Sequence, residues 1–509
     1  ACQSSLDLSS FQVATAEESK PILAFLKLRS TRAFLLFSEA KPMKILMTNQ
    51  LRLVICMLLA LGPLAAGFSH LSTSSKASHC SLNAVKLPED PFKTATNEDG
   101  GAQEEWPLED ERKKAFTLQT PHSGRHFTPS HPNYKSRRIF RRSRKRFMEG
   151  WYYRLTLAEE KISFAFILSI EDPGTNSPLK LACIQVVGPD DEYLVQADRD
   201  DTKFWAWKHN QGAGYAFDYK KDDPSLKERT AFSREEWYES VESGFQILPL
   251  HLLGRVQGHD GTLGGVMKGQ GNPGECSFDF SVDPIAGWGD ADAKQRSTAG
   301  WLANFAVFEP HWQVTLADAR ASGTVTWKNR TYTFENEPFY AEKNWGKALP
   351  EKWYWTQCNS FEGYMDPGNE LAVTAGGGIR QVPFGQQEAL GMVSVHYKGK
   401  FYEAVPWTGT MGWKVDTWGS WVLYGKCTEG DRKFEVEVTY HVDPEETPGL
   451  VFRAPTPKEG MVYFCRDTFE ADVTLTLWEL EYDELRKDWV HKAGPPRIDR
   501  AKSSQGGAE

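Results

Sequence analysis

The feature that most constrains the fold is a two-residue periodicity that recurs along much of the 509-residue chain. Within residues 434–442, apolar side chains alternate with Glu, Thr and His, and residues 473–477 repeat the pattern. Successive side chains of a strand point to opposite faces, so this period indicates strands with one buried face. Residues 162–170 are instead largely apolar, which is typical of a strand buried on both faces.

Turn signals join several of these strands into antiparallel pairs. Residues 324–327 and 331–334 flank a Lys-Asn-Arg turn, which predicts a hairpin. Residues 393–397 and 401–405 flank a Lys-Gly-Lys turn, which predicts another. A single helix is clearly indicated, by a capping box. Many short strands with few helices favour a mainly β protein built from sandwiches or barrels.

The strand-rich region is too long for one ordinary barrel. We therefore expect two antiparallel β-barrels or sandwiches in tandem, the first over residues 120–310 and the second over residues 311–490. Small barrels can enclose one ligand, and an interior rich in Trp and Phe would suit a long apolar molecule. Residues 491–509 are expected to form a disordered tail.

The N-terminal region is expected to hold targeting segments. Residues 1–42 precede the first Met and are left unassigned. The apolar run at residues 53–68 ends in small residues, which is typical of a signal peptide, and the run is short for the alternative, a membrane anchor. Residues 69–82 are rich in Ser and free of acids, which resembles a plastid transit peptide. Residues 43–83 are therefore predicted to form a two-part targeting signal, a signal peptide followed by a transit peptide, for a plastid (chloroplast) of secondary origin.

Charge and cysteine usage narrow the function classes. Residues 84–119 are polar and acidic and are expected to be a linker. Seven basic residues lie within 137–146. They are expected either to bind anionic lipid head groups or to belong to a solvated loop insertion. The balance of 59 basic and 68 acidic residues excludes a generally basic nucleic-acid-binding protein. The eight cysteines form no C-x-x-C pair, which favours a reducing compartment over a disulfide framework.

The familiar motifs for cofactors and nucleophiles are missing or occur in the wrong context. Residues 269–274 match G-x-G-x-x-G, but Pro273 stands where a helix should begin. Residues 376–378 lack the Lys and Ser or Thr of a phosphate loop, and a bulge or turn is expected there. Neither H-E-x-x-H nor G-x-S-x-G occurs. Metal, nucleotide and serine-hydrolase chemistry are therefore not indicated, and no cofactor is expected.

Acidic residues within aromatic clusters are the remaining site candidates. On a strand over residues 305–314, Glu309 and His311 would share one face, and Pro310 would place them at an edge, a bulge or a barrel rim. Desolvation raises the pKa of a carboxyl group among aromatic side chains, so such an acid stays protonated and can donate its proton. The alternative is a structural ion pair between Glu309 and His311.

Eight longer motifs keep a specific order and spacing. They are residues 121–127 (PHSGRHF), 149–152 (EGWY), 287–290 (GWGD), 293–301 (AKQRSTAGW), 307–313 (VFEPHWQ), 342–346 (EKNWG), 374–381 (TAGGGIRQ) and 453–456 (RAPT). Over residues 120–483, the chain thereby resembles the plant and cyanobacterial tocopherol cyclase family, itself distantly similar to hydroxyneurosporene synthases. It departs from the family in Arg125, where relatives usually carry an aromatic residue, in the inserted basic run and in the missing glycine-rich tail.

This resemblance implies a lipocalin-like double barrel and a cofactor-independent, acid-catalysed cyclisation of phytyl benzoquinols to chromanols (γ- or δ-tocopherol) in vitamin E biosynthesis. Such an enzyme is an intramolecular lyase of the isomerase class. Its acid protonates a trisubstituted alkene, and the adjacent phenol oxygen closes on the tertiary cation. The expected partners are a prenylated benzoquinol lipid and, peripherally, a plastid membrane or lipid droplet, with no nucleic acid.

For this chemistry we expect Glu309 or Asp290 to be the acid, with His311 as its partner. Glu342 is a further catalytic candidate, and it would hold the quinol hydroxyls together with Asn344. The other substrate-binding candidates are Glu149, Trp151, Trp312, Trp345, Trp355 and Arg380. Two alternatives stay open, namely a non-catalytic lipocalin-like carrier of prenyl quinones and an alkene hydratase of the same fold.

Overall fold

The structure is a computed structural model that describes residues 120–127, 146–223, 231–258, 274–298, 310–382, 386–415 and 418–509, with the single residues 113, 116, 226 and 300. All of them belong to one compact unit, residues 95–509. The expected targeting segments, nearly all of the acidic linker and nearly all of the basic run lie outside the described residues. In the described part, no helix is long and apolar enough to cross a membrane.

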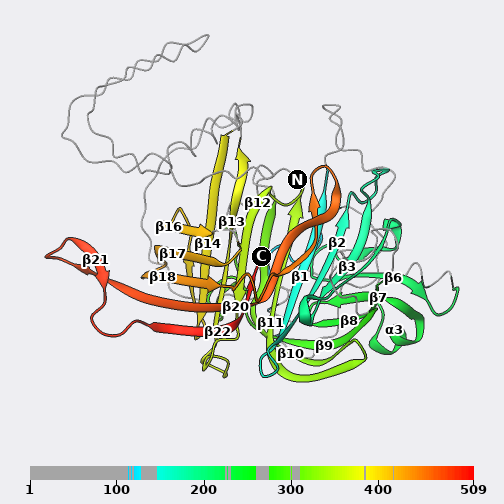
Figure 1. The fold of residues 1–509 in the computed structure, drawn as a ribbon, viewed down its shortest axis with the longest axis horizontal. Helices are drawn as coiled ribbons and strands as arrows, with labels where there is room; N and C mark the ends of the chain where they lie inside the picture. The colour runs from blue at the N-terminus through cyan, green and yellow to red at the C-terminus, as the bar shows by residue number, and fades with distance from the viewer. Residues whose placement is uncertain are drawn as a thin grey trace, which may run out of the picture. The chain divides into compact units, whose positions relative to one another are not determined.

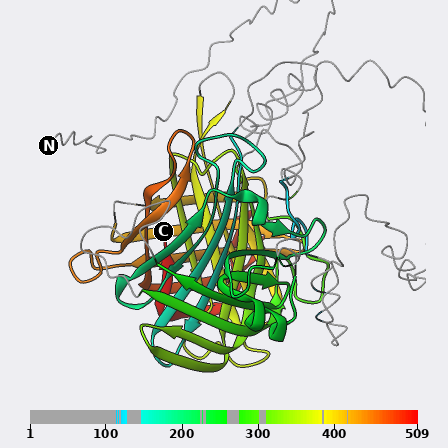
Figure 2. The ribbon, with the colours of Figure 1, turned by 90° about the vertical axis from the view of Figure 1, so that its right-hand side faces the viewer.

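The described chain forms two large antiparallel sheets that curl (Figures 1 and 2), which confirms the mainly β fold class. In the first sheet, the order is β4-β3-β2-β1-β11-β10-β9-β8-β7-β6-β5, so its first and last strands, β1 and β11, pair in the middle. Its strands are β1 (Met148–Leu157), β2 (Ile162–Glu171), β3 (Leu181–Val187), β4 (Tyr193–Asp198), β5 (Trp205–Ala206), β6 (Ala213–Tyr219), β7 (Val241–Leu248), β8 (His251–Gln257), β9 (Glu275–Ala286), β10 (His311–Trp327) and β11 (Arg330–Gly346).

The second sheet repeats this arrangement, with order β15-β14-β13-β12-β22-β20-β18-β17-β16 and with β19 and β21 paired to β20. Its strands are β12 (Lys352–Cys358), β13 (Leu371–Val382), β14 (Gln386–Tyr397), β15 (Lys400–Ala404), β16 (Gly409–Val415), β17 (Ser420–Glu429), β18 (Arg432–His441), β19 (Leu450–Thr456), β20 (Gly460–Asp483), β21 (Asp488–His491) and β22 (Ile498–Ala508). Here too the first and last strands of the sheet, β12 and β22, are neighbours.

Local sequence signals account for the turns and the helix. Both predicted hairpins are present, as β10–β11 and β14–β15. Lys328 and Asn329 adopt φ of 50° and 63°, the left-handed pair that a two-residue hairpin turn requires. The predicted capping box, Ser233 with Glu236, begins α3 (Arg234–Ser240), and two short 3₁₀ turns, η1 (Pro189–Asp191) and η2 (Asp201–Lys203), lie in the first sheet's connections.

The division between the two β regions differs from the expected boundary at residues 310/311. Strands β10 and β11 belong to the first sheet, and the chain enters the second sheet only after Gly346. The reason is that β11 returns across the sheet to pair with β1, from Leu155↔Phe339 to Met148↔Gly346. Proline at position 310 precedes a long strand of the same sheet and does not separate two domains.

The segment expected to be a disordered tail, residues 491–509, also differs. It contains β22, which lies between β12 and β20 with five of its last six residues buried. Its small residues are what the packing requires, because a Cβ at Gly507 would lie 2.8 Å from Arg154 Nη1 and 3.0 Å from the Trp355 ring. The composition of this segment is polar and rich in glycine, and it does not indicate a strand. The glycines are needed because large side chains approach the backbone closely.

The three largest apolar clusters of the described residues form the main interior. One fills the first sheet's curl, a second fills that of the second sheet, and a third contains residues of both sheets. Strand β1 shows how alternation divides them: Trp151 and Tyr153 belong to the first cluster, whereas Tyr152 belongs to the third. Each curl therefore contains its own apolar core, and the two sheets contact each other through a shared apolar layer.

Arg154 joins the sheets within this layer. Its side chain is 1% exposed, and its guanidinium donates to the Gln357 carbonyl (3.0 Å), the Gln357 side-chain oxygen (2.8 Å) and the Gln505 carbonyl (2.6 Å). These acceptors lie on β12 and β22, whereas Arg154 lies on β1. Charged donors make strong hydrogen bonds, and a buried acceptor that loses one remains desolvated.

We predict that Arg154→Met lowers the free energy of unfolding by about 3 kcal/mol, because two buried carbonyl groups lose their donor. Urea unfolding followed by tryptophan fluorescence measures the change. The matched control is Arg486→Met, at a side chain that is 74% exposed, where a change within about 0.5 kcal/mol is expected. Equal effects of the two substitutions would contradict the role assigned to Arg154.

Candidate active site

An apolar pocket with a volume of about 290 Å³ lies between the two sheets. Strands β1, β2, β10 and β11 contribute one wall, and β12, β13, β14 and β19 contribute the other. Its surface is mostly apolar, with Trp353 and Trp407 among its aromatic residues. The sequence suggested a guest inside a barrel. The apolar clusters fill both curls instead, and the ligand-sized space is formed where the two sheets face each other.

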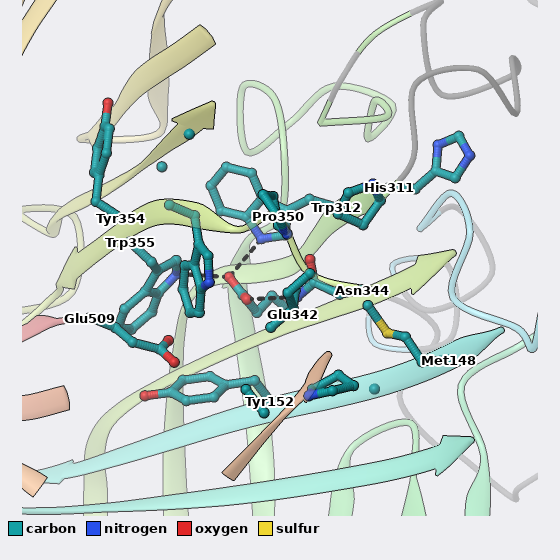
Figure 3. Close-up of a pocket in the computed structure, with 18 of the residues that line it drawn as sticks. Met148, Tyr152, His311, Trp312, Glu342, Asn344, Pro350, Tyr354, Trp355 and Glu509 are labelled. Atoms are coloured by element: carbon teal, nitrogen blue, oxygen red, sulfur yellow. Dashed lines mark hydrogen bonds between the residues drawn. The ribbon is translucent and has the colours of Figure 1, made fainter. Parts of the chain in front are cut away.

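A buried carboxyl group, Glu342, is held at this pocket by four donors, and Figure 3 shows the bonds from Trp312, Trp355 and Asn344. The indole N–H groups of Trp312 and Trp355 donate to Oε2 at 2.7 and 2.9 Å. The Tyr340 hydroxyl donates to the same oxygen at 2.6 Å. The Asn344 amide donates to Oε1 at 3.2 Å. Tyr340, Glu342 and Asn344 share one face of β11 because they are two residues apart.

The surroundings of Glu342 favour a neutral acid that can still release its proton. Burial raises the pKa of the carboxyl group, and the hydrogen bonds from Tyr340, Trp312, Trp355 and Asn344 oppose that rise. In the described part of the chain, no cation lies within ion-pair distance of Glu342. Because three donors already occupy Oε2, the proton of the neutral acid belongs on Oε1, which is bonded only to the amide. After donation, all four donors stabilise the carboxylate.

The next residue along β11, Lys343, faces the opposite way and forms a buried ion pair with Glu149. The ammonium lies 2.7 Å from Glu149 Oε1, and both side chains are at most 1% exposed. Burial pushes the Glu149 pKa up, but Lys343 and His126 hold it below its ordinary value. Glu149 also accepts the backbone N–H groups of His126 and Phe127, at 2.9 and 3.0 Å. Its carboxyl group therefore anchors the segment 120–127 and does not line the pocket.

Three further predicted residues surround this ion pair on the same side of the first sheet. The Trp345 indole is stacked between His126 (3.9 Å between centroids) and His311 (5.0 Å). Burial lowers the pKa of His311. His311 borders the pocket, but its imidazole is directed away from Glu342 (Figure 3). Trp151 also borders the pocket, while its ring lies over Lys343 and against Phe204 in the first core.

The other predicted residues are placed as follows. Asp290 lies outside the pocket, where it accepts the Phe401 N–H (2.7 Å) and pairs with Arg432 (3.0 Å). Glu309 lies outside the described residues, so its predicted role as the acid remains a prediction. Arg380 is on β13, and its side chain lies outside the described residues. Trp312, Glu342, Asn344 and Trp355 are thus the predicted residues that the structure brings together.

Sequence reasoning missed three features of the site. Tyr340 could have been found, because alternation on β11 places it on the same face as Glu342. Glu509 lines the pocket from the end of a segment whose composition gave no strand signal. The glycines at 376–378, for which a bulge or turn was expected, lie on β13 in uninterrupted register with both neighbours. They make room for rings, because a Cβ at Gly376 would lie 3.0 Å from the Trp312 indole.

The fold and this site together define a class: a β-rich protein whose two curled sheets enclose an apolar, indole-lined pocket with a buried acid. Residues 145–509 match the family described as tocopherol cyclase-like, and the chain belongs to this family. It is similar to the probable chloroplastic tocopherol cyclase of Oryza sativa subsp. japonica, with 36% identity over 379 residues, covering 72% of this chain and 74% of the relative.

A second relative, the chloroplastic tocopherol cyclase of Zea mays, is 36% identical over 387 residues, covering 74% of this chain and 75% of the relative. Among solved structures, the kievitone hydratase of Nectria haematococca is 10% identical, with a TM-score of 0.35, covering 71% of this chain and 87% of that one. That likeness is too distant to indicate an activity.

We predict that Lys343→Met lowers the free energy of unfolding by about 3–5 kcal/mol, because it leaves the Glu149 carboxylate buried without its cation. Adding Glu149→Gln should recover part of the loss, so that the double variant is more stable than the sum of the two single changes implies. Urea unfolding of the four proteins measures the coupling.

The matched control is the same cycle at the surface pair of Lys492 and Glu479, 2.7 Å apart with side chains 53% and 24% exposed, where a coupling below about 1 kcal/mol is expected. Additive effects of the Lys343 and Glu149 substitutions would show that the two groups are not an interacting buried pair.

Proposed function

We propose that this protein is a tocopherol cyclase, an intramolecular lyase of the isomerase class that converts phytyl benzoquinols to γ- or δ-tocopherol. The family match and the two curated relatives support the activity. The observation that carries the chemistry is the buried Glu342 carboxyl group, held by two indoles, a phenol and an amide in an apolar pocket. The nucleophile of the ring closure is the phenol oxygen of the substrate itself.

The proposed reaction begins with the proton on Glu342 Oε1. It moves to the less substituted carbon of the trisubstituted alkene, and the tertiary carbon becomes the cation. The phenol oxygen next to the prenyl chain then forms the new C–O bond, its O–H bond breaks, and the proton returns to the Glu342 carboxylate. Atoms and charge balance over the cycle, so the chemistry needs neither an oxidant nor a cofactor.

The pocket assists this cycle in two ways. The indoles of Trp312 and Trp355 place electron-rich ring faces in the pocket, and each such face stabilises a nearby cation by about 0.5–2 kcal/mol. Apolar walls from both sheets exclude water, which would otherwise capture the cation as an alcohol. A hydratase would need a supply of water beside the acid, and a carrier would not need a buried acid with four directed donors.

We propose that the protein is located in a plastid, because both curated relatives are described as chloroplastic. The two-part address in residues 43–83 adds the finer proposal of a secondary plastid reached by a signal peptide and a transit peptide. The proposed partner is the prenylated benzoquinol lipid. Because that lipid resides in membranes or lipid droplets, we propose peripheral association with one of these surfaces.

We predict that Glu342→Gln lowers the rate of chromanol formation by at least about 100-fold, because the amide cannot protonate the alkene. The assay incubates the purified full chain with dimethylphytylbenzoquinol, without added metal or nucleotide, and follows the chromanol by chromatography. Glu445→Gln, at an exposed position, is the matched control and should retain the activity of the unaltered protein. An active Glu342→Gln variant would remove Glu342 from the role, whereas an inactive unaltered protein would refute the cyclase function.

We predict that cyclisation falls as the pH rises through the pKa of Glu342, because only the neutral acid carries the proton. The hydrogen bond from Tyr340 lowers that pKa, so Tyr340→Phe should raise it and move the alkaline limb of the pH–rate profile upward by about one pH unit. Tyr482→Phe, at an exposed position, should leave the profile in place. A Tyr340→Phe profile that is lower but not displaced would contradict the proposed tuning.

A further inference from the structure

A second carboxyl group, Glu509, lines the same pocket as Glu342. Its backbone N–H and C=O pair with the C=O and N–H of Trp355, both at 2.8 Å. This pairing fixes Glu509 beside a residue that already binds Glu342 through its indole. Within the described residues, no lysine, arginine or histidine lies within ion-pair distance of the Glu509 side chain.

The surroundings of Glu509 favour a neutral acid that is turned toward the pocket. Burial raises its pKa well above the ordinary value, the negative charge of Asp467 adds to the rise, and the hydrogen bond from Cys465 opposes it. Burial also raises the pKa of Cys465, so that thiol keeps its proton and donates a hydrogen bond to Glu509 Oε1. The carboxylic proton of Glu509 is therefore left on Oε2. A neutral carboxyl group can donate one hydrogen bond and accept others.

The hydroxyl of Tyr152 is a further polar group with spare bonding capacity near Glu509. Tyr152 lines the pocket and is 7% exposed, and its hydroxyl has no hydrogen-bond partner. Its ring packs edge-on against Trp355, at 5.1 Å between centroids. Figure 3 shows Glu509 and Tyr152 on the Trp355 side of the pocket, with the Glu342 carboxyl facing the same space. Buried polar groups normally have partners, so this end of the pocket is suited to a polar group of a ligand.

We propose that Glu509 binds the hydroxyl group of the quinol ring that does not react. This inference rests on the proposed function and names the feature of the substrate that the pocket selects. The prenyl chain and the reacting hydroxyl are neighbours on the ring and must lie toward Glu342. The para hydroxyl is at the far end of the ring and lies toward Glu509. The pocket thereby selects a para-hydroquinol over a prenylated monophenol.

The test combines two variants with two substrates. Glu509→Met removes the polar group and keeps its bulk, whereas Glu509→Gln retains a donor and an acceptor. The substrates are the prenylated para-hydroquinol and its analogue without the para hydroxyl. We expect the unaltered protein to favour the hydroquinol by about tenfold in kcat/KM, the value of one buried hydrogen bond. Glu509→Met should lose about tenfold on the hydroquinol and less than about twofold on the analogue, and Glu509→Gln should behave like the unaltered protein.

Two results would overturn the proposal: equal use of both substrates by the unaltered protein, or a Glu509→Met variant that loses the same factor on both. Failure of the proposed function is separate, because the unaltered protein would then form no chromanol from either compound. In that case, the role of Glu509 is tested by binding. Quenching of tryptophan fluorescence measures how the unaltered protein and the two Glu509 variants bind the same two compounds. A Glu509→Met variant that binds both as the unaltered protein does would refute the role of Glu509.

Discussion

Glu342 and Lys343 are neighbours in the chain, and the pleat of β11 turns them to opposite faces of the first sheet. One faces the pocket among donors that carry no charge, and the other faces the core and meets the carboxylate of Glu149. The contrast sets the protonation states. Glu149 is buried beside a cation and is held ionised, whereas Glu342 is buried without one and its pKa is raised. A shift of one residue in the register of β11 would exchange these environments, so the pairing of β11 with β1 and β10 is the constraint on which the site depends.

The four donors around Glu342 resolve an apparent conflict between holding a proton and releasing it. Burial alone would keep the acid neutral but would make its conjugate base too unfavourable for transfer. Indole, phenol and amide donors carry no net charge, so they do not ionise the acid in advance as a lysine would. Their hydrogen bonds become stronger when the carboxyl group becomes a carboxylate, and the stabilisation therefore appears at the moment of proton transfer.

The sequence predicted much of the fold because strands and two-residue hairpins are local patterns. The alternation, the Lys-Asn turn and the capping box at Ser233 all have structural counterparts. What it could not predict depends on contacts distant in the chain. Strand β22 was hidden because its two glycines are explained only by groups distant in the chain, with Val473 packed against Gly506 and with Arg154 and Trp355 packed against Gly507. Within the site, local motifs identified Glu342, Asn344, Trp312 and Trp355, but they could not separate these from Glu149 and Trp345, which occupy the other face of the same sheet.

The location of the pocket follows from how each sheet is built. In both sheets, the first and last strands pair in the middle, so β1 with β11 and β12 with β22 lie at the centres of their sheets. These central strands carry the residues that join the sheets, including Arg154 to Gln357 and Gln505, and they also carry Glu342, Trp355 and the residue that follows β22. Each curl is occupied by its own aromatic core, and the apolar pocket that contains the acid lies where the outer faces of the two sheets meet. The acid therefore lies on a strand that is paired on both sides, and such a rigid element keeps the direction of a proton donor fixed during a reaction.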